Sequence, residues 1–318
     1  MQQSTGFKKT KFQKNAVIDQ GVKALLFGFA LLSSSFIFIV IGVILIKGAT
    51  PFFTNNNGLG AVNIFTFLTG DTWLTGTAFQ SNLYSIGFII ISTIFIAFLS
   101  LLLSFPVGVL TALFIAKVAP KRLAEILRTV VEMLASIPSI IYGLFGAGII
   151  LKIVYDASAL IGYQSKGGNS IISAVIVLAI MTIPTIASIS EVAIRSVSKD
   201  LELGSLALGA SVTQTNFKVV LAAAKSGIFT SAILGIGRVL GEATAVSLVA
   251  GGRRSGYSFD ILDTTSTLTT IMLEGLKETT GLDYDIRFSV GIVLMIVILI
   301  TNLTLNAVKK KVGGIDVK

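Results

Sequence analysis

Six long apolar runs, separated by polar segments, dominate the pattern along this 318-residue chain. They cover residues 24–46, 83–116, 126–151, 170–190, 226–250 and 288–308. A run of about 18 or more nearly uncharged residues is long enough to cross the hydrocarbon core of a bilayer as a helix. The pattern therefore predicts an all-α polytopic membrane protein with about six transmembrane helices.

The first run predicts a retained helix and not a cleaved leader. A signal peptide has only about 7 to 15 apolar residues, followed by a small-residue cleavage site. The run at 24–46 is longer, and Lys47 follows it without such a site.

The polar segments divide the chain into four parts: a basic tail at 1–23, a first helix with an external stretch at 24–82, a membrane domain at 83–308 and a basic tail at 309–318. Pro106, Pro138 and Pro184 fall inside the second, third and fourth runs. Membrane helices tolerate proline, so we expect bends or packing features at these positions.

Composition and charge agree with a membrane protein. The chain is 53% hydrophobic and 13% charged, with a mean hydropathy of +0.88, whereas soluble domains are roughly a quarter charged. The net charge is +9, and most Lys and Arg residues lie on the side of the six runs where both termini fall. Positive loops favour the cytoplasm, so both termini are predicted there, and the basic balance does not indicate nucleic-acid binding.

The chemistry available to the chain is narrow, because it has no cysteine and no histidine. These absences exclude disulfides, a Ser-His-Asp triad and the usual zinc ligands. No GxxxxGK[ST] phosphate loop is present. We expect no catalytic residue, metal or cofactor, and any ATP must be bound by another chain.

The stretch "GIGRVLGEATAV" places Arg238 and Glu242 within an apolar run. Residues four apart share one helix face, so the two side chains are predicted to pair. Gly237 and Gly241 form a GxxxG motif that favours close helix packing. The pair is either a structural lock or part of a substrate path, because ionisable residues in membranes commonly mark such paths and arginine suits oxyanions.

The segment 191–225 predicts two short helices. Asp200 can cap one that runs to Leu208, Gly209 suits its end, and Thr213 can cap a second that runs to Ala224. Leu203, Leu206, Ala207 and Ala210 share one face at helical spacing. Such an apolar face is expected to pack on the membrane helices or on a partner protein.

The chain resembles the permease subunits of ABC importers, in particular the C-type permease of bacterial phosphate uptake. "GSLALGA" (204–210) matches the Gly and aliphatic spacing of the signature loop of these permeases. "EMLASIPSIIYGLFG" (132–146), "TIPTIASISEVAIRSVS" (182–198), "LGIGRVLGEATAVSLVAGG" (234–252) and "LTTIM" (268–272) carry the closer likeness. Two positions depart from the family pattern: its glutamate falls at Leu203, beside Glu202, and its closing proline falls at Ala222.

The resemblance implies a type I, MetI-like fold and ATP-driven phosphate import across a bacterial plasma membrane. Its implied partners are an A-type sister permease, a dimer of ATP-binding subunits and an extracellular phosphate-binding protein. It implies a phosphate contact for Arg238 and a counter-ion or gate for Glu242. It also implies that the loop at 191–225 docks on the ATPase through Glu202, Leu203, Gly204, Leu206, Ala207, Gly209 and Ala210.

Four alternatives remain at this point: the A-type sister permease, a permease for another oxyanion, an ion-gradient secondary transporter and a channel. The halves show no internal repeat of the kind that secondary transporters carry, and no TVGYG filter sequence is present. A membrane enzyme is the weakest interpretation, since no nucleophile–base pair stands out.

Overall fold

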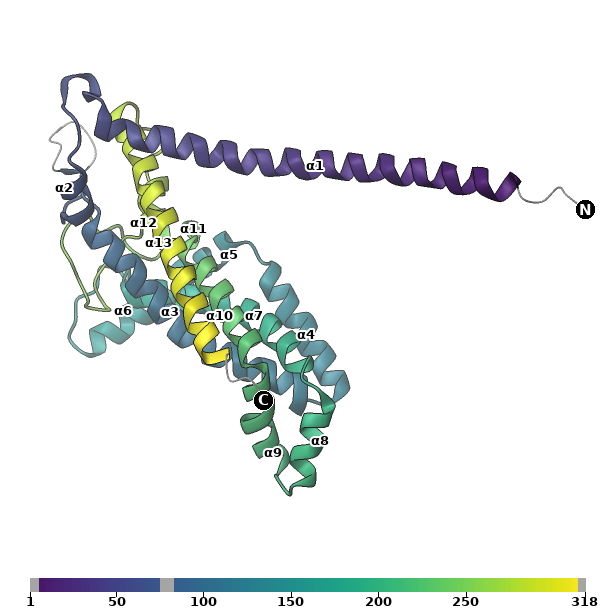
Figure 1. Ribbon diagram of the computed structural model, residues 1–318. Coiled ribbons are helices and arrows are strands. Elements are labelled where there is room, and N and C mark those ends of the chain that lie inside the picture. Colours follow the sequence, from purple (N-terminus) through teal and green to yellow (C-terminus); the bar gives the residue numbers. More distant parts are fainter. Residues whose placement is uncertain (1–5, 75–82, 314–318) are drawn as a thin grey trace, which may run out of the picture.

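The computed structural model describes residues 6–74 and 83–313, and these are largely helical (Figure 1). In chain order the elements are α1 (Gly6–Phe53), η1 (Asn56–Gly58), α2 (Ile64–Thr69), α3 (Gly87–Leu113), η3 (Phe114–Val118), α4 (Lys121–Ser136), α5 (Ser139–Phe145), η4 (Gly146–Ile150), α6 (Leu151–Leu160), α7 (Ile171–Arg195), α8 (Lys199–Ala207), α9 (Val212–Gln214), η5 (Thr215–Val220), α10 (Leu221–Leu240), α11 (Thr244–Ser247), α12 (Leu268–Leu273) and α13 (Leu282–Gly313).

Within the described residues, six helical stretches are long and apolar enough to cross a membrane, which confirms the predicted all-α polytopic class. They are Asp19–Phe53, Gly87–Val118, Ser139–Leu160, Ile171–Arg195, Val212–Leu240 and Leu282–Lys311. Pro106 and Pro184 lie inside α3 and α7, as expected.

The third stretch lies further along the chain than the predicted run at 126–151, and Pro138 is not inside a helix. The chain breaks at Ile137, which has an extended backbone (ψ 128°), and Pro138 precedes the first turn of α5. A proline disfavours helical backbone at the residue before it and lacks an N–H for helix bonding, so it separates α4 from α5. The membrane-length helix is α5–η4–α6.

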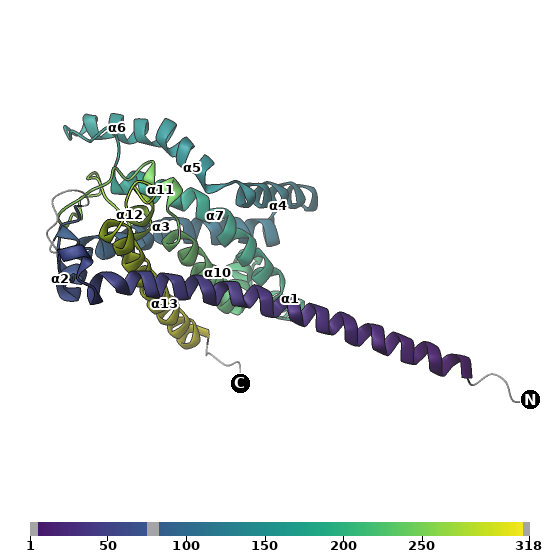
Figure 2. The same ribbon diagram turned by 90° about the horizontal axis from the view of Figure 1, so that it is seen from above.

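Helix α7 forms the centre of the bundle. Two thirds of its most apolar window (67%) is buried inside the chain, more than in any of the other five stretches. It packs along α3 and α10, and α4 and α5 lie against it on another side (Figure 2). Gly108 of α3 permits close packing, because a Cβ there would lie 2.7 Å from Ile186 Cγ2.

Helix α1 extends away from the bundle and meets it only near its C-terminal end, where it crosses α13 (Figures 1 and 2). Gly48 sits against the α13 backbone, since a Cβ there would lie 2.7 Å from Phe288 O. Ser289 Oγ donates to Gly48 O at 2.7 Å. The predicted basic tail at 1–23 is part of this helix from Gly6 onward, while residues 1–5 lie outside the described chain.

Short elements close the two ends of the bundle. At one end α8 and α9 project beyond the membrane-length helices, and we call this the α8 end (Figure 1). At the other, the α12 end, α2 and α12 pack with the segments around them over a second apolar core that includes Phe67, Trp73 and Ile271. The bundle thus ends in the projecting helices α8 and α9 on one side and in a packed layer of short elements, including α2 and α12, on the other.

Candidate functional site

Arg238 lies close to the middle of the bundle's height. It is half-buried near the end of α10, and its Nη1 donates to Thr185 Oγ1 of α7 at 2.8 Å. Thr185 is about 21 Å along α7 from Ile171 and about 15 Å from Arg195, at 1.5 Å per residue. Within the described chain, the threonine hydroxyl is the only hydrogen-bond partner of the Arg238 side chain.

Glu242 does not pair with Arg238, so the predicted ion pair on one helix face is wrong. Helix α10 ends at Leu240 and Gly241 is its C-cap, which places Glu242 outside the helix. Its Oε1 instead accepts from Thr244 Oγ1 at 2.8 Å and from the Ala245 amide at 3.0 Å. The carboxylate therefore holds the start of α11, and Arg238 keeps a neutral partner.

Gly237 and Gly241 do not form the close helix contact predicted from their spacing. A Cβ at Gly237 would meet nothing within 4 Å, and one at Gly241 would meet only carbonyls of its own helix. The close contacts of α10 are made by Gly227 against Ala193 and by Gly235 against Ile186 and Thr182. GxxxG spacing marks glycines that can pack closely, but the neighbouring helix decides which ones do.

Two further hydroxyls join the region around Glu242. Ser139 Oγ and Thr244 Oγ1 lie 2.9 Å apart and link the first turn of α5 to α11. Thr269 Oγ1 donates to Glu242 O at 2.7 Å and links α12 to the same turn. Because α5 begins here, free N–H groups of a membrane-length helix, and the positive end of its dipole, also lie at mid-height. We call Thr185, Arg238, Glu242, Ser139 and Thr244 the mid-bundle site.

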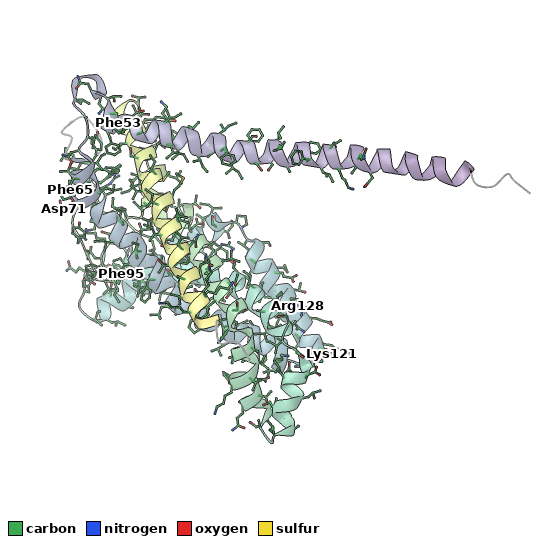
Figure 3. The ribbon with its side chains drawn as sticks, in the orientation of Figure 1. Phe53, Phe65, Asp71, Phe95, Lys121 and Arg128 are labelled. Carbon is green, nitrogen blue, oxygen red and sulfur yellow. The ribbon has the colours of Figure 1, made fainter. Side chains whose placement is uncertain are left out.

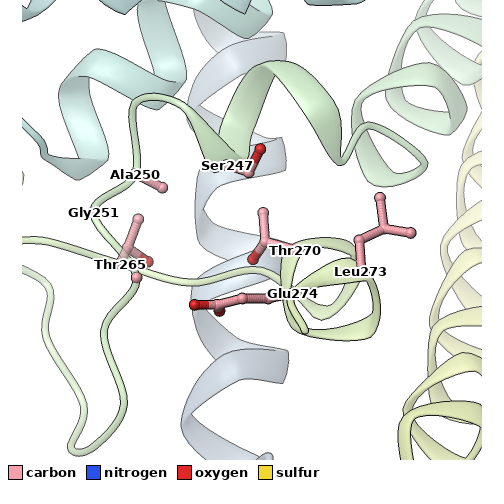
Figure 4. Close-up of a pocket in the computed structure, with 8 residues that line it drawn as sticks. Ser247, Ala250, Gly251, Thr265, Thr270, Leu273 and Glu274 are labelled. Atoms are coloured by element: carbon pink, nitrogen blue, oxygen red, sulfur yellow. The ribbon is translucent and has the colours of Figure 1, made fainter. Parts of the chain in front are cut away.

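A pocket of about 460 Å³ lies beyond this site, between the end of α11 and α12. It is lined by Ser247, Ala250, Gly251, Gly252, Thr265, Thr270, Leu273 and Glu274. In Figure 4 the Glu274 side chain points from α12 toward the loop that carries Gly251 and Thr265. Glu274 Oε1 also accepts from Arg254 Nη2 at 2.5 Å. The pocket thus offers hydroxyls and a carboxylate that is partly neutralised.

The predicted loop at 191–225 is a helical arm, with different caps from those expected. Ser198 caps α8 by accepting from the Asp200 amide, so Asp200 is a first-turn residue and not the cap. Ser211 forms a capping box with Gln214, so the cap is Ser211 and not Thr213. Gly209 has φ +86° at the corner, as expected for the residue after a helix.

The second helix of the arm does not end at Ala224. The described chain is helical from Val212 through η5 into α10 and stays so to Leu240. The arm and the helix that carries Arg238 are therefore one stretch.

The apolar side of the arm is open to its surroundings. None of the α8 side chains is buried, and Leu203, Leu206 and Leu208 are 62%, 40% and 91% exposed. Gly204 and Ala207 are also exposed, and Ala210 is half-buried. Glu202 differs from its neighbours, because its carboxylate forms an ion pair with Lys117 at the end of η3.

Several residues of these sites were not singled out from the sequence. Thr185 and Ser139 each directly follow a proline, Pro184 and Pro138, and a hydroxyl beside a helix irregularity in an apolar run is a usable signal. Glu191, at the α8 end of α7, binds Arg128 and Arg195. The sequence shows the four-residue spacing between Glu191 and Arg195, but the contact between Glu191 and Arg128 of α4 is evident only from the fold.

Comparisons with known proteins agree with this architecture. Residues 104–312 match the family described as binding-protein-dependent transport system inner membrane component. The chain is 34% identical over 254 residues to the probable ABC transporter permease protein YqgH of Bacillus subtilis, covering 79% of this chain and 78% of that one. It is 32% identical over 243 residues to the phosphate transport system permease protein PstC of Xylella fastidiosa, covering 71% and 75%.

Solved structures share the fold. A chain of a bacterial alginate ABC transporter, in complex with an alginate pentasaccharide-bound periplasmic protein, aligns with a TM-score of 0.64 at 19% identity, covering 93% of this chain and 97% of that one. A chain of the MetNI methionine ABC transporter in an inward-facing conformation aligns with a TM-score of 0.55 at 19% identity, covering 70% and 94%. With its six membrane-length helices and a family match over residues 104–312, the chain belongs to the binding-protein-dependent inner membrane components, as a multi-pass permease subunit of a MetI-like ABC importer.

Proposed function

We propose that this chain is a permease subunit that moves inorganic phosphate into a bacterial cell, with ATP hydrolysed by separate subunits. Arg238 would bind the anion transiently at the mid-bundle site. Glu242 would contribute by holding the start of α11 in place, which replaces the direct pairing with Arg238 expected from the sequence.

The observation that carries this proposal is the neutral partner of Arg238. A guanidinium within a membrane bundle is costly, and such groups usually have a partner or line a water-filled path. Arg238 has only the Thr185 hydroxyl among the described residues. Its remaining N–H groups can offer an oxyanion the parallel hydrogen bonds that the planar guanidinium favours.

Phosphate is favoured over other oxyanions by the relatives. Besides the Xylella protein, the phosphate transport system permease protein PstC 1 of Mycobacterium tuberculosis is 29% identical over 288 residues, covering 80% of this chain and 85% of that one. A guanidinium alone does not distinguish phosphate from sulfate or molybdate. The other oxyanions are therefore the competing substrates that the transport assay must include.

The partners follow from the family and the exposed surfaces. The family name and the alginate complex support a substrate-binding protein at the α12 end. The exposed leucines of α8 support docking of an ATP-binding subunit at the opposite end, through the arm. In the proposed orientation both termini and the arm would face the cytoplasm, and the distribution of Lys and Arg along the sequence supports this orientation.

A second permease chain of A-type is the proposed membrane partner. The apolar window of α1 is 0% buried within this chain, and Ile126, Val130 and Met133 form an exposed stripe on α4. These surfaces need lipid or protein against them. A sister chain of the same fold would cover part of them and leave the rest to the bilayer.

The proposal is tested in liposomes that contain the permease pair and its ATPase, with the binding protein supplied outside. We expect uptake of labelled phosphate that requires ATP and exceeds sulfate uptake. Arg238→Gln should lower phosphate uptake about 100-fold, by analogy with the loss of rate when one oxyanion-hole donor is removed from an enzyme. Arg238→Lys keeps the charge without the planar fork and should retain part of the activity.

The matched control is Arg122→Gln, which removes one positive charge from an exposed position on α4. It should transport as the unaltered chain does. Normal phosphate uptake by the Arg238→Gln complex would show that Arg238 is structural. Faster sulfate than phosphate uptake would assign the other oxyanion, and uptake without the ATPase would reject the ABC importer mechanism.

A further inference from the structure

Glu191 is a buried carboxylate that the mid-bundle site does not use. It lies on α7 about 9 Å closer to the α8 end than Thr185, at 1.5 Å per residue, and its side chain is 6% exposed. Its Oε1 accepts from Arg128 Nε at 3.1 Å, Arg128 Nη2 at 2.7 Å and Arg195 Nε at 2.7 Å. One carboxylate therefore holds two guanidinium groups.

The two arginines connect different helices to this carboxylate. Arg128 belongs to α4 and is labelled with Lys121 in Figure 3. Arg195 belongs to the last turn of α7, and its Nη2 also donates to Ile115 O of η3 at 3.3 Å. Glu191 thus joins α4 and α7, and through Arg195 it reaches η3. We call Arg128, Glu191 and Arg195 the Glu191 cluster.

The same short segment, η3, also holds the arm. Lys117, two residues after Ile115, forms an ion pair with Glu202 of α8, and both side chains are only partly exposed (15% and 22%). The arm therefore connects through η3 to the Glu191 cluster, and through the cluster to α4.

Helix α4 continues this connection to the mid-bundle site. After the break at Pro138 the chain enters α5, where Ser139 contacts Thr244, which in turn donates to Glu242. Removing Glu191 would leave Arg128 beside the carboxylates of its own helix, Glu125 and Glu132, and α4 would lose its ion-pair attachment to α7.

We propose that Glu191 is a positioning residue for coupling, which keeps α4 in register with η3 so that movement of α8 reaches the mid-bundle site. Its role is to hold Arg128 and Arg195 together, without contact with the transported anion. This inference rests on the proposed function, because coupling has meaning only if an ATPase docks on the arm. Contiguous packed and ion-paired elements can carry such coupling when they have two discrete arrangements, and measured coupling is the evidence for it.

The test compares ATP hydrolysis with anion uptake in the reconstituted complex, using labelled phosphate. Glu191→Gln should leave binding-protein-stimulated ATP hydrolysis near normal while the number of anions moved per ATP falls about fivefold or more, within the usual range of coupling between sites. Glu191→Asp keeps the charge and should restore part of the ratio. A residue needed only for folding would lower uptake and hydrolysis together.

Arg128→Gln provides a second route if Glu191→Gln does not assemble. It leaves Glu191 paired with Arg195 and should lower the transport ratio less than Glu191→Gln, and the double variant should be non-additive because the residues act together. Arg122→Gln, which removes the same charge from the same helix outside the cluster, should have no effect. A normal ratio in both Glu191→Gln and Arg128→Gln, or a normal ratio in Arg128→Gln when Glu191→Gln fails to assemble, would overturn the inference.

These outcomes are separable from failure of the proposed function. If the variants couple normally while Arg238→Gln still loses uptake, the cluster has no coupling role and the import function stands. If the unaltered complex moves no anion, or moves it without ATP, the proposed function itself fails, and the inference fails with it.

Discussion

Glu191 and Arg238, two charged side chains within the bundle, differ in the number and charge of their hydrogen-bond partners. This difference favours a structural role for Glu191 and a binding role for Arg238. The Glu191 carboxylate accepts three N–H groups, whereas Arg238 donates to one hydroxyl. A fully paired buried charge holds helices together, because removing either partner leaves an uncompensated charge. A charge with one neutral partner keeps capacity for a ligand, which makes Arg238 the better candidate for the anion contact.

The sequence predicted Arg238 as a candidate but not its surroundings. The four-residue spacing to Glu242 indicates pairing only if the helix continues through both residues, and it ends at Leu240. The contact with Thr185 joins residues 53 apart in the chain, so no local pattern contains it.

Asp263 makes the loop before α12 sensitive to acid. Burial alone would raise the pKa of its carboxyl, but hydrogen bonds from Ser258 and the Thr264 amide and the ion pair with Arg253 outweigh burial and hold it below the ordinary 3.8. A lowered folded pKa contributes stability that is complete above the unfolded value and is lost as pH falls through the folded value. The protection factors of residues 253–265, which are exchange rates corrected for the pH dependence of intrinsic amide exchange, should stay constant from pH 7 to 5 and fall below about pH 4.

Asp263→Asn is the matched variant for this prediction. It should raise exchange of the same segment already at neutral pH, because the ion pair with Arg253 is gone, and it should remove the acid-dependent step. An unchanged acid step in this variant would assign the pH dependence to another group.

At the scale of elements, the corner between α8 and α9 depends on backbone conformation. Gly209 has φ +86° and no atom lies within 4 Å of a Cβ placed there, so the requirement for glycine is conformational and not steric. A β-branched residue is strained in this region of backbone space by about 1–2 kcal/mol. The angle between α8 and the helix that leads into α10 therefore depends on one residue.

Gly209→Val should misdirect α8 and lower binding of the ATPase or uncouple hydrolysis from transport. The measurement is co-purification of the ATP-binding subunit, followed by transport per ATP hydrolysed. Gly209→Asn should be tolerated, since asparagine adopts left-handed backbone more readily. Gly162→Val, which makes the same change at another left-handed glycine with open space around it and outside the arm, is the control. Normal docking and coupling in Gly209→Val would contradict the role of the corner.

The sequence predicted that the arm contains two helical segments, but it did not predict the residues at which they begin and end. Helix-capping residues are dense here, with Ser198, Asp200, Ser211 and Thr213 all able to cap. Ser198 is the N-cap of α8, because this helix starts at Lys199. Ser211 is the N-cap of α9, because Gln214 completes a capping box with it. The break at Pro138 was missed for a related reason: an apolar run does not reveal whether a proline bends a helix or ends it.

At the scale of the whole molecule, the described part of α1 meets the bundle only near its C-terminal end, where it packs on α13 and where Phe52 contacts Phe67 of α2. Its 48 residues correspond to about 72 Å of helix, and only the part near Gly48 meets the other helix. The fold class followed from the six apolar runs, because length and hydropathy alone identify membrane-length helices. Which helix forms the centre and which stands apart did not follow, since all six runs are similarly apolar.

The absence of cysteine from the sequence allows a direct test of the α1 contact. Ile44 Cγ2 lies 3.5 Å from a Cβ placed on Gly291, so the side chains at the two positions are direct neighbours. Ile44→Cys combined with Gly291→Cys should cross-link in membranes on mild oxidation, seen as a mobility shift that reductant reverses. Gly28→Cys with Gly291→Cys should give no intramolecular cross-link, because Gly28 has no neighbour within 4 Å. Cross-linking of the control pair alone would place α1 differently.

The continuous helical stretch from Val212 to Leu240 links any tilt of the arm to the position of Arg238. About 39 Å of rod separates Val212 from Arg238, at 1.5 Å per residue. A tilt of roughly 5° at the arm would then swing the far end by about 3 Å, comparable to a hydrogen-bond length. If an ATPase docks on the arm as proposed, a small rotation of the arm would be enough to separate the Arg238 guanidinium from Thr185 and so release a bound anion.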